Sequence, residues 1–311
     1  MGSNKTFKNL DEQVEILRNK GLTINDVDYA KTILLRENYF FLSGYRHIFM
    51  GDSKQSKFIE GTKFEELYAM FLFDRALRNI FFKWILVVEN NFKSITSYAL
   101  SKKYGFKDKD YLNAKNFNPD SMKQRQVHDV LNKVKRQIRV NGQRHSATMH
   151  YIDNYGYIPM WILVKVLSFG IMSEFYGILK ADDQISIASN YKIDPATLCI
   201  YLSIVANYRN ICAHEEILYD HKTQKNIPDN AYFGLLNIPK NEDGYIYGKN
   251  DLFSLVLIMK KLLTKHDFKD LIGEISYEID KLAGRIDTVD TLKILNRSGF
   301  PENWLDITNY D

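Results

Sequence analysis

Proline, glycine and cysteine are all scarce in this chain. Of its 311 residues, six are proline, sixteen are glycine and two are cysteine, and the stretch from Phe64 to Lys103 contains neither proline nor glycine. Because these two residues interrupt helices, long segments without them favour helical structure. Cys199 and Cys212 belong to no CxxC pair or Cys/His cluster. We therefore predict no metal site and interpret both as small buried residues in a reducing compartment.

Long hydrophobic runs are also missing. The longest apolar stretches, Trp84 to Val88 and Met160 to Met172, are short or are interrupted by Lys165. Neither has the length of a membrane span. The N-terminus is polar and has no apolar core of a secretory signal. We therefore expect a cytoplasmic protein that does not interact with a membrane.

Charge is nearly balanced overall but unevenly distributed. The net charge is +4, with 45% hydrophobic and 14% aromatic residues, which is typical of a globular protein. Residues 102–145 carry twelve Lys or Arg and four Asp or Glu, a net of +8, whereas the rest carries thirty and thirty-four, a net of −4. Such a segment would suit a polyanion. A solvated helix face beside a basic loop is the alternative explanation.

Hydrophobic periodicity predicts an all-α fold. Leu10, Val14 and Leu17 recur at helical spacing, and Asp26 can cap a second helix. Residues 64–103 form either one very long helix or two packed helices with a kink, preceded by a capping box at 62–65. Further helices are predicted over 122–140 (basic and amphipathic), 160–179, 182–189, from Pro195 through His214, over 252–263 and 268–282, and near 292.

The last third of the chain interrupts this pattern once. Residues 233–238 and 245–247 flank the turn-forming sequence Asn241 to Gly244, which predicts a small β-hairpin near 230–248. We expect an N-terminal helical module over 1–60, a helical core over 62–220, and a region over 221–311 in which the hairpin and C-terminal helices pack on the core.

The segment Tyr208 to His214 concentrates polar chemistry in an apolar helix. Arg209 can hold a phosphate with its planar fork of donors, and His214 can move a proton near neutral pH. At 100° per residue, Asn210 and His214 share one helical stripe, whereas Arg209 lies well round the cylinder. Two copies related by a twofold axis could bring these side chains together, so we expect a dimer. A helix break near Ala213 would weaken this argument.

A purely structural role is the alternative for the same residues. His214 could stabilise the negative end of its helix beside Glu215 or Glu216, and Arg209 could pair with Glu89. Trp161 and Phe169 are expected to belong to the core.

The sequence resembles a known family in several blocks that stand in order. They are Asn38 to Tyr45, Phe73 to Arg78, Val88-Glu89, Pro159-Met160-Trp161 with Ser168-Phe169-Gly170, and Arg209 to His214. The last block is similar to the signature of HEPN ribonucleases, and the whole resembles abortive-infection proteins of the AbiD/AbiF type. Glu215 and Glu216 depart from the more basic continuation expected there.

This resemblance implies an all-α, HEPN-like helical bundle, a homodimer, and metal-independent cleavage of RNA in phage defence. Arg209, Asn210 and His214 would be catalytic, without a cofactor, and a small non-coding RNA could restrain the activity. Residues expected to hold RNA backbone are Lys133, Lys135, Arg136, Arg139 and Arg144. Possible supporting residues are Glu89, Arg75, Arg78 and His150, for which ion-pair or structural roles are equally open. DNA is not an expected partner. A non-catalytic RNA-binding regulator and a phage-protein sensor remain alternative functions.

Overall fold

The fold is all-α, as predicted. The computed structural model describes residues 6–51, 57–141, 144–242 and 244–310. Within these ranges the helices, with η marking 3-10 turns, are α1 (Leu10–Asn19), α2 (Val27–Glu37), α3 (Tyr39–Ser43), η1 (Gly44–Phe49), α4 (Phe64–Tyr104), α5 (Asp108–Tyr111), η2 (Ala114–Asn116), η3 (Ser121–Lys123), α6 (Gln124–Asn141), α7 (Ser146–Tyr155), α8 (Met160–Val166), α9 (Phe169–Gly177), α10 (Ala181–Ala188), η4 (Ser189–Tyr191), α11 (Pro195–Ala213), α12 (Ala231–Leu235), α13 (Leu252–Leu262), α14 (Lys265–Ala283), α15 (Thr291–Arg297) and η5 (Trp304–Asn309). None of them is long and apolar enough to span a membrane.

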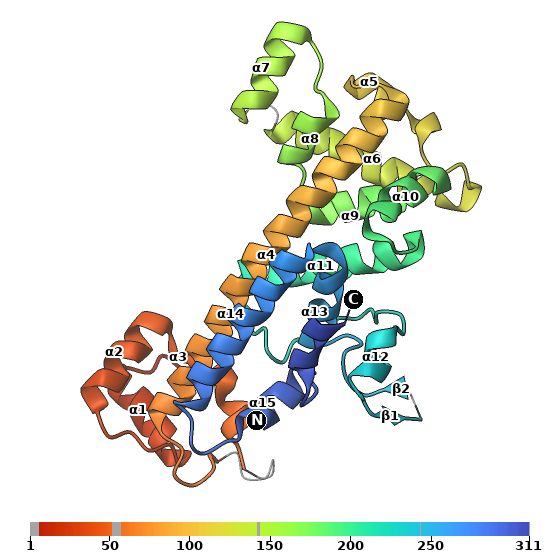
Figure 1. The fold of residues 1–311 in the computed structure, drawn as a ribbon. Coiled ribbons are helices and arrows are strands. Elements are labelled where there is room, and N and C mark those ends of the chain that lie inside the picture. Colours follow the sequence, from red (N-terminus) through yellow and green to blue (C-terminus); the bar gives the residue numbers. More distant parts are fainter. Residues whose placement is uncertain (1–5, 52–56, 142–143, 243, 311) are drawn as a thin grey trace.

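Helix α4 is the axis of the molecule. Its 41 residues form one helix, about 60 Å long, so the first of the two predicted alternatives is confirmed. Figure 1 shows α1–α3 and α14 beside its N-terminal half, and α5–α10 around its C-terminal half. Helix α11 crosses α4 between these two groups. Helices from all three expected regions therefore pack on α4, and the division at residues 60 and 220 stays a prediction.

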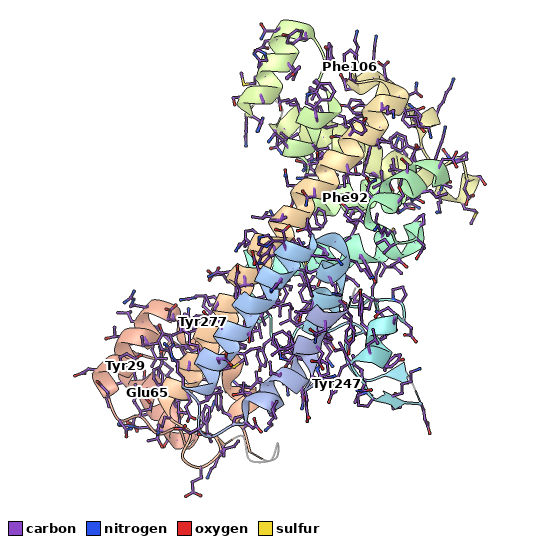
Figure 2. All side chains as sticks on the ribbon, viewed as in Figure 1. Tyr29, Glu65, Phe92, Phe106, Tyr247 and Tyr277 are labelled. Atoms are coloured by element: carbon purple, nitrogen blue, oxygen red, sulfur yellow. The ribbon has the colours of Figure 1, made fainter. Side chains whose placement is uncertain are left out.

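The core lies where α4, α9 and α11 meet. Phe92 of α4 is fully buried and packs edge-on against Phe169 and Tyr176 of α9, with ring centroids 6.1 and 5.9 Å apart. Phe169 is thus a core residue, as predicted. Figure 2 shows Phe92 at this junction. Burial of these aromatic rings fixes how α9 packs on α4.

Three local predictions need correction. The predicted helix over 160–179 is two helices, because the chain turns at 167–168 and the Ser168 hydroxyl accepts a hydrogen bond from the Ile171 amide at 3.3 Å. The capping box of α4 lies one residue later than the predicted box at 62–65, because Lys63 is the N-cap and Glu66 supplies the capping carboxylate. Trp161 was expected in the core but is 44% exposed. Helix α7 has no counterpart in the prediction.

The predicted hairpin is present but much shorter. Strand β1 (Lys240–Asn241) pairs antiparallel with β2 (Gly244–Tyr245), and these are the only strands in the described part of the chain. Residues 233–235 belong to helix α12 and not to a strand. The Phe233 ring of α12 packs in a tilted geometry against Tyr245 of β2, with the ring centroids 4.6 Å apart.

Glu66 attaches the C-terminal helices to the start of α4. Its carboxylate accepts hydrogen bonds from the amides of Asp287 and Thr288 at 2.7 and 2.8 Å and from the Lys63 amide at 2.8 Å. Burial acts to raise the pKa of Glu66, but the hydrogen bonds from Lys63, Thr288 and Asp287 outweigh it, so the pKa lies below its ordinary value. The charged form is therefore the one that stabilises the fold.

We expect Glu66→Gln to lower the free energy of unfolding by about 1 to 2 kcal/mol at pH 7, because a charge-assisted acceptor is lost. A carboxylate with a lowered folded-state pKa stabilises above its unfolded pKa, about 4.3, and loses this effect as the pH falls through the folded value. The difference between wild type and Glu66→Gln should thus shrink below about pH 4 in denaturant titrations. The neighbouring exposed Glu65 provides the control Glu65→Gln. A difference independent of pH would contradict this assignment.

Candidate functional site

Helix α11 carries the predicted motif to its C-terminal end. Asp194 caps its first turn by accepting from the Thr197 amide at 2.9 Å, as its sequence predicted. The helix stops at Ala213, and His214 occupies the C-cap position. Glu215 then takes a left-handed conformation with φ of 55°, and the Glu216 amide donates to the Ile211 carbonyl at 3.1 Å, which is a Schellman ending. The helix thus ends at the position where a break would weaken the sequence-based expectation of a dimer, although the His214 amide still donates to the Asn210 carbonyl at 2.9 Å as in a continuing helix.

The three predicted catalytic residues differ in exposure. The side chains of Asn210 and His214 are exposed, whereas Arg209 is half-buried. The Arg209 guanidinium lies over the Phe82 ring, 5.7 Å from its centroid, and its buried Nε has no hydrogen-bond partner among the described residues. No ion pair joins Arg209 to Glu89 among the described residues, so the pairing suggested for these two residues is wrong, and Glu89 accepts from the Lys93 ammonium at 2.6 Å.

An open cleft of about 640 Å³ lies beside the end of α11. His214, Glu215, Glu216 and Ile217 form one side of it, and the opposite side comes from α2, α3, η1 and the first turns of α4. The arginines that line it are Arg36, Arg46, Arg75 and Arg78, the histidines are His47 and His214, and the acidic residues are Glu37, Glu215 and Glu216. Arg209 and Asn210 are not part of its lining.

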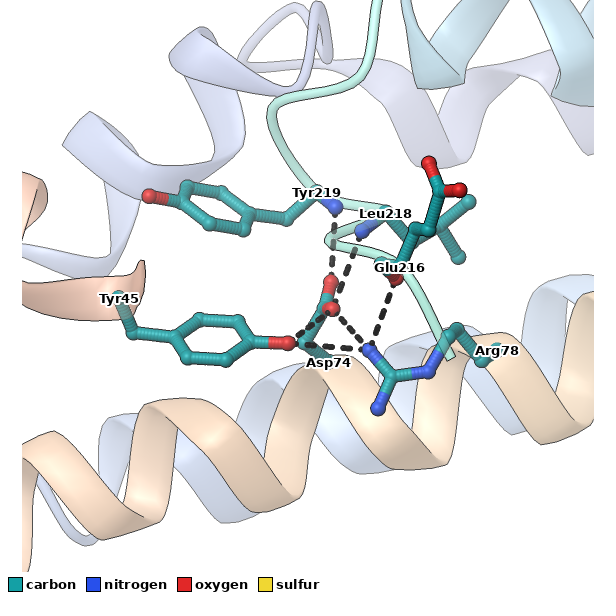
Figure 3. A network of polar contacts seen from close by, with 6 residues as sticks. All are labelled: Tyr45, Asp74, Arg78, Glu216, Leu218 and Tyr219. Carbon is teal, nitrogen blue, oxygen red and sulfur yellow. Dashed lines mark hydrogen bonds and ion pairs between the residues drawn. The ribbon is translucent and has the colours of Figure 1, made fainter. Parts of the chain in front are cut away.

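A buried acid holds the backbone that follows His214. Asp74 is completely buried and accepts hydrogen bonds from the Leu218 amide at 3.1 Å and the Tyr219 amide at 2.7 Å. The Tyr45 hydroxyl donates to the same carboxylate at 2.7 Å, and the Arg78 guanidinium forms an ion pair with it. Figure 3 shows this network, which we call the Asp74 network. It joins η1, α4 and the chain after α11.

The negative charge of Asp74 in this network is paired with the positive charge of Arg78. Burial raises the pKa of Asp74, and the Arg78 guanidinium, the two amides and the Tyr45 hydroxyl oppose that rise. Arg78 also donates to the Glu216 carbonyl at 3.2 Å and to the Tyr45 hydroxyl at 3.0 Å. All of these contacts use one nitrogen, Nη1, which joins α4 to η1 and to the chain after α11, so Arg78 positions the cleft wall.

Arg75 occupies a different environment one turn earlier. Its guanidinium forms a two-pronged pair with Glu37, at 3.1 and 2.5 Å, and lies 4.5 Å from the Phe71 ring centroid. The hydrogen bond to Glu37 raises the pKa of Arg75, and that contact in turn lowers the pKa of Glu37. Glu215 adds a smaller attraction to Arg75. This pair links α2 to α4 on the cleft wall.

The cleft wall also includes a close contact between Gly44, at the start of η1, and Ile217, in the chain after α11. A Cβ on Gly44 would lie 2.8 Å from the Ile217 Cδ1 atom, so the missing side chain lets these two segments touch. Two of the sequence blocks that carry the family resemblance, residues 38–45 and 73–78, thus contact the chain that follows the last block, residues 209–214. Phe40 and Phe41 belong to the first block, line the cleft, and are exposed.

The predicted RNA-contacting residues lie elsewhere. Lys135, Arg136, Arg139 and Arg144 are exposed, and Lys133 forms a 2.7 Å ion pair with Glu174. Helix α6 packs on α8 and α9 beside the C-terminal half of α4 (Figure 1). None of these residues lines the cleft.

The remaining candidates have local partners. Glu89 is buried and is paired with Lys93, whose ammonium also donates to the Leu167 carbonyl at 2.7 Å. One carboxylate oxygen of Glu89 has no partner in the described chain. His150 is exposed on α7 and packs against Tyr151 and Tyr155.

Sequence reasoning missed several residues of the cleft. Arg36, Arg46 and His47 flank the aromatic block at 38–45, and this basic flanking was the available signal. No contact could be inferred from it, because these residues lie more than 160 positions before His214. Within the described residues no group of three or more His, Cys, Asp or Glu side chains could hold a metal ion.

Comparison with known families covers this whole region. The family model described as Abi-like protein matches residues 32–220, a range that contains every residue lining the cleft. The chain belongs to the Abi-like family. It is thus a member of an abortive-infection family. No curated protein and no solved structure matches the chain significantly.

We expect Asp74→Ala to destabilise this Abi-like protein by about 3 to 5 kcal/mol, because the Arg78 charge and two backbone amides would remain buried without their acceptor. Thermal and denaturant unfolding followed by circular dichroism would measure the loss. Asp74→Asn keeps one acceptor oxygen and should fall between Asp74→Ala and wild type. Unfolding of Asp74→Ala within 1 kcal/mol of wild type would show that the network is dispensable.

Proposed function

We propose that the protein is a metal-independent endoribonuclease of the HEPN type that acts in phage defence. The observation that supports this most directly is the exposed His214 on an open cleft whose walls carry several arginines. Arg209 precedes it by five residues and has a buried Nε without a partner among the described residues. A proton-transferring imidazole beside guanidinium groups fits chemistry on a phosphodiester.

The proposed reaction is transesterification within RNA. His214 takes the proton from the 2′-hydroxyl while that oxygen attacks the adjacent phosphorus, and a proton is returned to the departing 5′-oxygen. Arg209 stabilises the charge that grows on the phosphoryl oxygens, and Asn210 orients the phosphate or the imidazole. The products are a 2′,3′-cyclic phosphate and a 5′-hydroxyl, so the reaction needs no metal or cofactor.

Dimerisation is part of the proposal. Since Arg209 lies outside the lining of the cleft that His214 faces, one subunit does not present both side chains to the same cleft. A twofold axis near the end of α11 would place His214 and Arg209 of both copies around one strand. The exposed residues of α6 would hold RNA backbone, and a small non-coding RNA is a possible restraining partner.

One observation favours a second candidate function. The separation of Arg209 from the cleft lining is also what a non-catalytic RNA-binding regulator would show, with Arg209 fixed on Phe82 as a structural residue. Such a protein would bind RNA in the cleft and leave it intact.

We expect His214→Ala and Arg209→Ala each to reduce RNA cleavage by about 10²- to 10⁴-fold, because each removes a group that acts in the transition state. The assay incubates purified protein with end-labelled RNA in excess EDTA and identifies the cyclic phosphate end. His266→Ala, at an exposed histidine on α14, is the matched control. Equal cleavage by all variants would disprove the catalytic assignment, and RNA binding without cleavage by wild type would favour the regulator.

Arg46→Ala should weaken substrate binding more than the chemical step. This half-buried arginine lines the cleft, and a phosphate contact contributes about one to the slope of log affinity against log salt. We expect KM to rise several-fold, kcat to change little, and the salt slope to fall by about one. The exposed Lys293 on α15 provides the control Lys293→Ala, and an unchanged salt slope for Arg46→Ala would place RNA outside the cleft.

A further inference from the structure

A row of exposed aromatic rings lies at the end of the molecule where α4 finishes. Phe106 follows α4, Tyr155 ends α7, and Trp161 belongs to α8. These side chains are 44%, 57% and 44% exposed. Figure 2 shows Phe106 at this end, beyond Phe92. Large aromatic rings are costly to leave in water, so a cluster of them on a surface indicates binding.

The rings form an unbroken series. Successive centroid distances are 5.5 Å from Tyr151 to Tyr155, 6.1 Å to Tyr157, 5.5 Å to Phe106 and 6.4 Å to Trp161. We call these five residues the aromatic row. Contacts between adjacent rings are tilted or edge-on, so the rings restrain one another and the exposed members keep ring surface accessible to solvent.

Cations border the aromatic row. The Lys107 ammonium lies 5.3 Å from the Tyr157 centroid and 6.0 Å from that of Phe106. Lys165 is exposed one turn after Trp161 on α8, and Arg144 is exposed just before α7. Of the nearby acids, Asp108 is engaged by the Ile158 amide at 3.1 Å.

Other charged groups near the row are few. Lys109 and Asp110 lie on α5, and Asp153 is exposed on α7. Of the row, only Phe106 lies in the segment 102–145 that holds the positive excess of the chain. The cations around the row, Lys107, Lys109, Arg144 and Lys165, outnumber Asp108, Asp110 and Asp153, and one of these acids is already engaged by a backbone amide. This balance favours an anionic ligand.

We propose that the aromatic row binds unpaired bases of a single-stranded RNA segment outside the His214 cleft. Exposed rings that accept stacked bases, bordered by cations that attract the backbone, are the two elements of single-strand recognition. A duplex hides its base faces and cannot use such a row. The proposal takes from the proposed function only the nature of the ligand, and binding to the row does not require cleavage.

Tryptophan fluorescence gives a direct test. The chain has three tryptophans, of which Trp84 and Trp304 are only 5% and 4% exposed. Stacking of a base on Trp161 should therefore quench most of the solvent-accessible emission. The measurement uses full-length His214→Ala protein, so that RNA stays intact, and titrates a 12-nucleotide polyuridine strand or a 12-base-pair RNA duplex at several salt concentrations.

We expect the single strand to quench Trp161 and the duplex not to. In fluorescence anisotropy, Trp161→Ala and Tyr155→Ala should each weaken single-strand binding about tenfold, with an unchanged salt slope because the lost contact is not ionic. Trp161→Phe keeps a stacking ring, so affinity should be retained while the quenching disappears. Tyr277→Ala, at a 65% exposed ring on α14, is the matched control.

Several results would overturn the proposal. They are single-strand affinity unchanged in both alanine variants, equal quenching by the duplex, or a loss of self-association in sedimentation without a loss of RNA affinity, which would assign the row to a protein interface. The two proposals fail separately. Quenching by RNA together with no cleavage by wild type would support RNA binding at the aromatic row and disprove the proposed ribonuclease activity. Normal cleavage without quenching would support the ribonuclease activity and disprove RNA binding at the row.

Discussion

The candidate site depends on the hydrogen bonds that the buried Asp74 carboxylate accepts. The chain after His214 leaves a helix and becomes irregular, so its amides need acceptors away from water. Asp74 accepts from two of these amides and also from Tyr45 and Arg78. A buried ion pair contributes little net stability by itself because of its desolvation cost. Its effect here is to fix the relative positions of three segments that are far apart in sequence.

Helix α4 supplies both the buried Asp74 network and residues that line the cleft. Arg78 lines the cleft and uses its Nη1 to bind protein groups of the wall, whereas Arg75, one turn away, is joined to Glu37. His214 can lie exposed because the residues on either side of it are held, by the Schellman ending of α11 before and by the Asp74 network after. An exposed side chain on a fixed backbone has the preorganisation that proton transfer requires.

The regular parts of the fold could be predicted from the sequence, because they depend on local patterns. The absence of glycine and proline over 64–103 corresponds to one continuous helix, and Asp194-Pro195 marks the true start of α11. The end of α11 was harder to place, since Glu215 adopts a left-handed conformation that usually favours glycine. Trp161 is an aromatic residue expected in the core, but α8 packs on α4 and buries Met160, Leu163 and Val164 instead. The lining of the cleft joins α2 and η1 to residue 214, and no single-sequence pattern reports contacts at that separation.

The length of α4 separates two kinds of surface on one rigid element. About 40 Å of helix lie between Arg78 and Tyr104, with the cleft at one end and the aromatic row at the other. The cleft offers arginine side chains, and the attraction of such groups for a phosphate chain would weaken as salt rises. The row offers ring faces, whose contacts with bases are much less sensitive to salt. A strand that contacts both would be positioned by its bases at one end while its backbone is presented to His214 at the other. Because α4 is a single unbroken helix, the fold fixes the distance between the cleft and the row. Under both proposals the protein would therefore select RNA with an unpaired stretch at a set distance from the linkage that reaches the cleft.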